Sequence, residues 1–222
     1  FKEDKQLVSF REHSKPMLAM LMSSRGPLPL EMVQAAVAGG GAVPKSDAWT
    51  VARQQHVEFV QRMCVGSLVE VGFLQFSHKS FPDWLEQNET FRVEKMAGEV
   101  LLGAACVKAV SEKDAASAGV QVYAVKHVVA HLVAAGRTQE AKALLLDVGF
   151  LMAKSTDGPA LVRDCQRLKG DRTMELLGSC VGLALADLRT DPRRLVGQLV
   201  GRLMGVVEGA AKERERKMKG VV

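Results

Sequence analysis

The chain has 222 residues, of which 47% are hydrophobic and only 5% aromatic, and its formal net charge is +5. This length accommodates one large domain or two small ones, and the shortage of aromatic side chains favours packed helices over a β-sandwich. The mild basic excess permits binding to nucleic acid or to a membrane surface without requiring it, and no run of about 20 apolar residues predicts a membrane span.

The first residues, FKEDKQLVSF, are charged and amphipathic, so they do not form the pattern of a signal peptide. Because the chain starts without methionine inside a predicted helix, we interpret it as an internal piece of a longer protein. No two of the four cysteines have metal-ligand spacing, which disfavours a zinc motif. We expect them to be free, buried or partly buried thiols in a reducing compartment, the cytoplasm.

Three helices, a small hairpin and a closing helix are predicted over the first 90 residues. Apolar residues at three- and four-residue steps predict a helix over 5–24, with a kink or break after Ser14 because Pro16 follows. The segment GSLVEVGFLQFS alternates around Gly72 and predicts two short strands. The other helices are expected over 30–38, over 48–65 with Asp47 as its cap, and from near Pro82. This is the order of elements in a winged helix.

From Val93 onward the sequence shows no strand pattern. The segment YAVKHVVAHLVAAGRTQEAKALLLD predicts a helical hairpin like one unit of a solenoid. We therefore expect a mainly α protein: a winged-helix module with a small β-wing over 1–90, a solenoid-like helical domain over 91–218, and a C-terminal end over 219–222. The predicted helices of the second domain, separated by breaks such as DVGF, cover 93–112, 120–135, 138–147, 158–169, 172–188 and 192–218.

Two patterns resemble ligand sites and are interpreted otherwise. The loop GGGAVPKS has Pro44 where a phosphate-binding loop needs glycine, and a helix rather than a strand precedes it, so we expect a plain connection between helices. His127 and His131 lie one helical turn apart, but Val128 and Val129 follow the first, so the glutamate of a zinc-protease motif is missing. We expect a polar seam with Tyr123 that packs against the next helix, and no metal site.

Three segments in order, FREHSKPMLAMLMSSRGPLPLEMV, VGFLQFSHKSFPDWL and YAVKHVVAHLVAAGRTQEAKALLLD, resemble the region that follows the ATPase core of STAND-class P-loop NTPases. The resemblance is to NACHT-type proteins and to the apoptotic protease-activating-factor type with C-terminal WD repeats. HKSFPDWL is similar to a family signature of the form His-x-Ser-Phe-x-Asp-aromatic-Leu at the end of the wing. DPRRLVGQLVGRL is similar to the helical connection before a propeller.

This resemblance implies that His78 contacts the β-phosphate of ADP bound in a neighbouring ATPase module and helps to hold a resting state. The remaining signature residues would be structural: Phe81, Trp84 and Leu85 packing the closing helix, and Ser80 and Asp83 capping or bracing it. The chain itself has no Walker A or Walker B motif. We therefore expect no enzyme activity and no cofactor in this chain, with ADP or ATP bound elsewhere in the full-length protein.

The main hypothesis is thus a non-catalytic regulatory and scaffold segment of a signalling NTPase, whose helical domain relays the nucleotide state to repeats or protein partners. The first alternative is a purely structural protein–protein interaction module of a large assembly. The second is a DNA-binding winged helix, with Arg53, Gln54, Gln55 and Arg62 on its third helix. Glu58 among these residues, and a wing without basic side chains, disfavour contact with nucleic acid.

Overall fold

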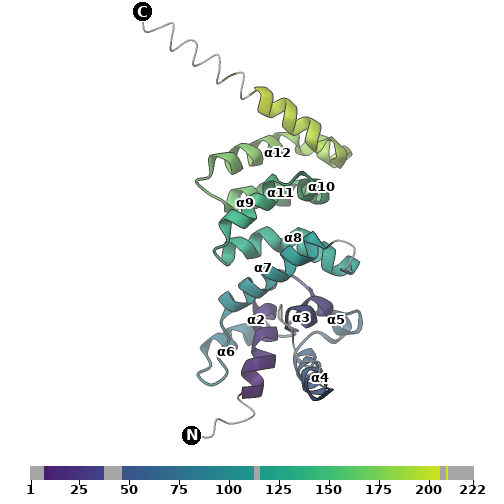
Figure 1. Ribbon diagram of the computed structural model, residues 1–222, viewed down its shortest axis with the longest axis vertical. Coiled ribbons are helices and arrows are strands. Elements are labelled where there is room, and N and C mark those ends of the chain that lie inside the picture. Colours follow the sequence, from purple (N-terminus) through teal and green to yellow (C-terminus); the bar gives the residue numbers. More distant parts are fainter. Residues whose placement is uncertain (1–7, 38–46, 113–115, 206–208, 210–222) are drawn as a thin grey trace, which may run out of the picture. The chain divides into compact units, whose positions relative to one another are not determined.

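A computed structural model describes residues 8–37, 47–112, 116–205 and 209 (Figure 1). The described chain is mainly helical, with one small antiparallel sheet of two strands. It divides into two compact units, Phe1–Arg137 and Thr138–Val222. None of the helices in the described ranges is sufficiently long and apolar to cross a membrane. The loop at 38–46, with the GGGAVPKS pattern up to Ser46, lies outside the described residues.

Of the expected kink or break after Ser14, no break occurs, because the first helix runs without interruption from residue 8 to Ser23, and an irregular turn stands at the expected place. Its first part is a π-helical turn, η1 (Phe10–Ser14), and its second part is α2 (Lys15–Ser23). In η1 the backbone N–H of Lys15 donates to the carbonyl of Phe10, five residues back. The wider turn accommodates Pro16, which has no N–H and would clash with a carbonyl in a regular helix.

The sheet pairs β1 (Leu28–Pro29) with β2 (Phe73–Leu74), so that Leu28 lies opposite Leu74. The predicted hairpin within residues 68–75 is therefore wrong. Its first half forms a short helix, α5 (Gly66–Glu70), and Gly72 turns the chain with φ +80 before β2 begins. An isolated antiparallel bridge joins Cys64 to Phe76 just beyond the strands. The partner of β2 thus lies in a distant segment of the sequence, which an alternating pattern of local residues cannot identify.

The other helices of the first unit agree with the predicted ranges. Two of them, α7 and α8, form an antiparallel pair, and α7 also crosses α2, where Gly98 lies directly against the backbone of Ala19. The predicted domain boundary between residues 90 and 91 lies inside this unit and stays a prediction. These helices are α3 (Leu30–Val37), α4 (Asp47–Gln61), α6 (Ser80–Gln87), α7 (Lys95–Ser111) and α8 (Ala118–Ala134).

The described part of the second unit contains an α-helix, α10 (Val148–Lys154), that the sequence did not predict. DVGF was expected to be a break, but Asp147 caps α10 by accepting a hydrogen bond from the backbone N–H of Phe150 at 2.7 Å. Residues 195–205 are also helical. The unit comprises α9 (Thr138–Leu146), α10 (Val148–Lys154), η2 (Ser155–Asp157), α11 (Gly158–Arg167), α12 (Arg172–Thr190) and η3 (Pro192–Arg194).

Candidate functional site

His78 lies in the short segment between β2 and α6, and its side chain is exposed. Its backbone carbonyl accepts a hydrogen bond from the N–H of Phe81 at 3.3 Å. Within the described ranges, no group is hydrogen-bonded to its imidazole ring. His78 is therefore not a core histidine within the part of the chain that the structure describes.

The apolar residues after His78 form an aromatic stack on α6. The rings of Phe81 and Trp84 are stacked with centroids 5.6 Å apart, and Phe76 meets Phe81 edge-on at 5.3 Å. Leu85 is buried, as expected for a residue that packs the helix onto the core, but Trp84 is 48% exposed. Trp84 thus departs from its expected packing role, because half of its side chain faces solvent.

Ser80 and Asp83 were expected to cap or brace α6, and no side-chain cap is present. The helix begins at Ser80 itself, its N-cap residue is Lys79, and that cap makes no side-chain hydrogen bond. Both Ser80 and Asp83 are exposed. The segment around His78 is therefore held by the backbone and the aromatic stack rather than by the polar signature residues.

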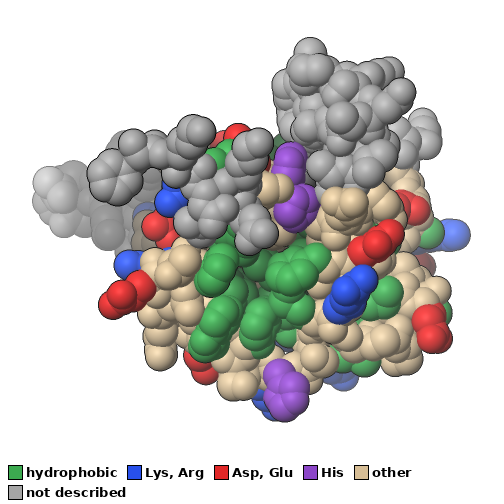
Figure 2. Space-filling model, turned by 90° about the horizontal axis from the view of Figure 1, so that it is seen from below, with side chains coloured by type: hydrophobic (Ala, Val, Ile, Leu, Met, Phe, Trp, Pro, Cys, Tyr) green, Lys and Arg blue, Asp and Glu red, His purple; other side chains and the backbone are tan. Residues whose placement is uncertain are grey.

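Figure 2 shows hydrophobic side chains gathered on one face, with histidine side chains on two sides of the patch. Among the described residues of the first unit, three aromatic side chains are exposed: Trp84, Phe59 on α4 at 47%, and Phe91 at 38%. Phe91 also meets Phe10 of the first helix edge-on, with centroids 5.1 Å apart. Exposed apolar side chains of this size are suited to contact with another protein module.

His131 belongs to a buried polar network that joins α7, α8 and the segment before β1. Its Nδ1 lies 2.6 Å from Oε2 of Glu99, and its Nε2 lies 3.1 Å from the hydroxyl of Tyr123. The other oxygen of Glu99 accepts a hydrogen bond from Arg25 at 3.1 Å. The backbone N–H of Arg25 donates to the Tyr123 hydroxyl at 3.3 Å, so the hydroxyl proton is free to be donated to Nε2 of His131. Burial raises the pKa of Tyr123, which keeps this hydroxyl protonated.

The polar seam predicted for Tyr123, His127 and His131 is therefore present, but it contacts a different helix from the one expected. The rings of Tyr123 and His127 lie 4.7 Å apart on α8, and His131 bonds Glu99 of α7, the preceding helix, rather than the next one. The described residues contain no group of three or more side chains that would hold a metal ion. The arrangement is suited to tying α7 to α8 and to the segment between α2 and β1, since Glu99 bonds both His131 and Arg25.

A second histidine site, which the sequence analysis did not find, joins the first helix to α4. The Nδ1 of His56 lies 2.7 Å from the hydroxyl of the buried Ser14, and Nε2 lies 2.8 Å from the hydroxyl of Ser9. The ring of His13 is 5.0 Å from that of His56. Burial and, to a smaller extent, the charge of His13 lower the pKa of His56 below its usual range.

Acidification is expected to destabilise the protein through His56. Because its pKa is lower folded than unfolded, the unfolded state binds more protons between the folded pKa and about 6.5, so the free energy of unfolding falls as pH falls through that window. Urea titrations between about pH 8 and pH 5 should show this loss, and His56→Gln should reduce it. An equal loss in both proteins would contradict this role.

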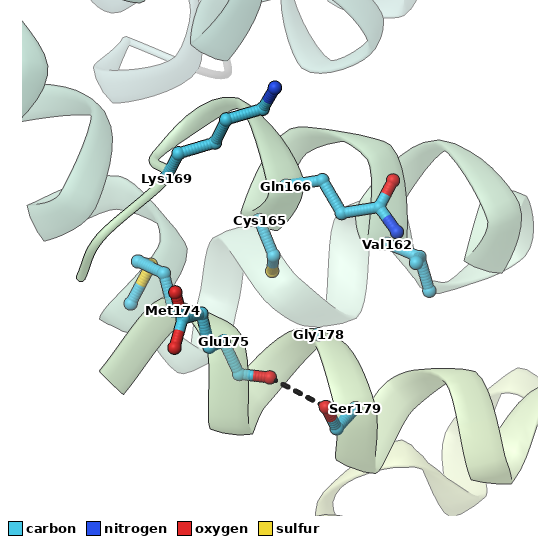
Figure 3. A pocket seen from close by; sticks show the side chains of 8 residues that line it. All are labelled: Val162, Cys165, Gln166, Lys169, Met174, Glu175, Gly178 and Ser179. Carbon is cyan, nitrogen blue, oxygen red and sulfur yellow. Dashed lines mark hydrogen bonds between the residues drawn. The ribbon is translucent and has the colours of Figure 1, made fainter. Parts of the chain in front are cut away.

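The four cysteines are free and buried, as predicted. Burial raises the pKa of Cys106 to about 12 and that of Cys165 to about 11, so neither is a thiolate near neutral pH. Cys165 lies under a surface groove of about 570 Å³ between α11 and α12, which Figure 3 shows with Lys169 and Ser179 at its rim. Ser179 donates its hydroxyl to the backbone carbonyl of Glu175 at 2.8 Å, and the groove presents no activated nucleophile.

Comparison with known proteins identifies no relative of this chain. No family model matches it, and neither the curated proteins nor the solved structures contain a significant match. The function must therefore be inferred from the residues and their geometry.

Proposed function

We propose that this chain is a non-catalytic regulatory segment of a STAND-class NTPase, in which a winged helix senses the nucleotide bound to an adjacent ATPase module. The order of elements in the first unit supports the winged-helix interpretation. β1 follows the first helix, the helices α3, α4 and α5 come next, and β2 returns to pair with β1. The bridge between Cys64 and Phe76 supplies the place of a third strand, and α5 occupies the place of the wing.

The observation that carries the proposal is the exposed imidazole of His78, which has no hydrogen-bond partner among the described residues. A histidine that holds a core together is buried and satisfied, as His131 is in this same protein. An exposed imidazole can donate a hydrogen bond to a phosphate oxygen, and it does so more strongly when protonated. The ligand would be ADP held by the neighbouring module, since this chain has no phosphate-binding motif of its own.

In this proposal the helical elements that follow the winged helix transmit its position. α7 packs against both α2 and α8, so a movement of the first helix is passed directly to the α7–α8 hairpin. Exchange of ADP for ATP would remove the contact with His78 and release the winged helix as a rigid body. The output would be a changed orientation of C-terminal repeats or of protein partners.

Loss of bound ADP is the expected result of His78→Ala in a protein that carries both this chain and its ATPase module. The change removes one charge-assisted hydrogen bond, so the fraction of protein that retains ADP through purification should fall, as measured by chromatography of the released nucleotide. Lys79→Ala, at the neighbouring exposed position, serves as the control and should retain ADP. Equal retention by the wild type and His78→Ala would exclude the sensor role.

The second candidate function is an interaction module without a nucleotide switch, and the exposed aromatic surface of the first unit favours it. Trp84, Phe59 and Phe91 are the kind of large side chains that anchor protein interfaces. A search of the coding sequence upstream of Phe1 would distinguish the two functions. A Gly-x-x-x-x-Gly-Lys-Ser/Thr motif there is required by the sensor function, and its absence would exclude that function.

DNA binding remains the third candidate, and the structure gives it little support. Gln54 on α4 donates to the carboxylate of Glu58 at 3.3 Å, which places an acidic group among the side chains that would meet DNA. The wing segment at 66–72 contains Glu70 and no lysine or arginine. Binding to duplex DNA that weakened steeply with added salt would favour this candidate over the other two.

A further inference from the structure

The helix over residues 195–205, yellow-green in Figure 1, has one buried side and one exposed apolar side. Leu195 and Leu199 are 0% and 7% exposed and hold the helix within the second unit. A second set of apolar residues, which we call the apolar stripe, lies beside them and faces solvent. It consists of Val196, Val200, Leu203 and Met204, which are 40%, 52%, 37% and 58% exposed.

On α12, Leu183 is also exposed, at 70%. Arg202 connects the two elements by donating to the backbone carbonyl of Leu183 at 3.2 Å. The members at 196, 200 and 203 are spaced by four and three residues, so they lie on one face of the helix. An apolar face of this kind, on a helix already fixed on its other side, is the geometry that receives a second helix.

Three glycines border the apolar stripe and leave space for a close approach. Gly197, Gly201 and Gly205 follow at four-residue steps, and a Cβ added at any of them would meet nothing within 4 Å. Each glycine lowers the stability of a helix by about 1 kcal/mol relative to alanine. Their backbone is therefore accessible to a neighbouring helix, which could pack more closely here than against larger side chains.

The charge around the apolar stripe identifies the kind of partner. From Arg189 to Gly205 the chain has four arginines and one acidic residue, Asp191, so this segment carries a net charge of 4 − 1 = +3. Two identical basic surfaces repel each other, which disfavours a second copy of this chain. The same segment contains no Trp, Tyr or Phe, the side chains that anchor interfacial helices in membranes, which disfavours a lipid surface.

We propose that the apolar stripe is a docking surface for an acidic amphipathic helix of a partner protein. The apolar side chains of that helix would cover Val196, Val200 and Leu203, and its carboxylates would meet arginines of the 189–205 segment. The docking surface does not depend on the proposed nucleotide sensing, because it uses other residues in the other compact unit.

The test is the binding of two synthetic helical peptides of about 20 residues, with leucines along one face and either glutamates or lysines elsewhere. Fluorescence anisotropy with the 222-residue chain should give a dissociation constant on the order of 10 μM for the glutamate peptide and much weaker binding for the lysine peptide. Equal affinities, or no binding of the glutamate peptide, would overturn the proposal.

Three variants locate the docking surface. Val200→Asp and Gly201→Leu should each weaken binding of the glutamate peptide at least about tenfold, the first by placing an acid on the stripe and the second by filling the glycine face. Val122→Asp, on the exposed side of α8, should bind as the wild type does. Circular dichroism should show that all three variants are folded, because the three substituted positions are open to solvent. Wild-type affinity in either of the first two variants would overturn the proposal.

Two further outcomes would assign the apolar stripe to another occupant. Sedimentation should give a mass that does not depend on protein concentration. Dimers that the Val200→Asp substitution abolishes would show instead that a second copy of the chain occupies the apolar stripe. The chain should not bind vesicles of phosphatidylcholine with phosphatidylserine. Vesicle binding that the Val200→Asp substitution abolishes would show instead that a lipid surface occupies the apolar stripe.

Discussion

Gly98→Ala is expected to disrupt the packing of the first unit. A Cβ at this position would lie 1.9 Å from the carbonyl oxygen of Ala19, 2.3 Å from its carbonyl carbon and 2.5 Å from the hydroxyl of Ser23. Two of these three atoms belong to the backbone of α2, so no change of rotamer can relieve the contact. The helices would have to separate, which would also stretch the 2.7 Å hydrogen bond from Ser23 to the carbonyl of Lys95.

We expect a loss of at least about 3 kcal/mol in the free energy of unfolding, the upper range for an overpacked core. Urea unfolding followed by circular dichroism measures it. Gly182→Ala is the matched control, since Gly182 also lies inside a helix but has nothing within 4 Å of the added methyl group. That change should stabilise the protein by up to about 1 kcal/mol. Equal effects of the two substitutions would show that α2 and α7 do not meet at Gly98.

Glu99→Ala is expected to have the second largest effect, because it removes the centre of the buried network. Its carboxylate bonds both Arg25 and His131, and the imidazole of His131 is completely buried. Without the carboxylate, the Nδ1 of His131 loses its partner in a place that water does not reach. A buried group left without its partner, together with the small cavity, lowers stability by about 3 kcal/mol.

Thermal and urea unfolding would measure this loss, and two variants separate its causes. Glu99→Gln keeps the shape and one acceptor, so it should lose less than Glu99→Ala. Glu112→Ala removes the exposed partner of Lys108, an ion pair of 4.0 Å, and should leave stability unchanged within about 0.5 kcal/mol. A loss for Glu99→Ala no larger than that for Glu112→Ala would mean that the network does not hold α7 to α8 and Arg25.

The sequence predicted most helices because their apolar residues recur with the helical period, as in α7 and α8. It did not predict α10, which is seven residues long and starts at the Asp147 cap inside a segment interpreted as a break. It also placed the partner of β2 in the wrong segment. The pairing between residues 28 and 74 depends on how the helices pack, and no local sequence pattern indicates it.

The candidate site was predicted only in part. The position of His78 before a helix was correct, but its exposure, like that of Trp84, depends on what packs around α6. The spacing of His127 and His131 indicated a polar seam without identifying Glu99, which is 32 residues away from His131. The contact of His56 with Ser14 was not predicted, because the two residues are 42 positions apart in the sequence. Hydrogen bonds between distant segments require the tertiary structure.

The dissociation rate of ADP tests the central claim most directly, namely that His78 contacts nucleotide in an adjacent module. A protein that carries this chain with its ATPase module would be loaded with fluorescent ADP and chased with unlabelled nucleotide. We predict that His78→Ala releases ADP about tenfold faster than the wild type, corresponding to about 1.4 kcal/mol for one charge-assisted hydrogen bond. His78→Gln, which retains a donor, should give an intermediate rate. Identical release rates for the wild type and His78→Ala would contradict the account.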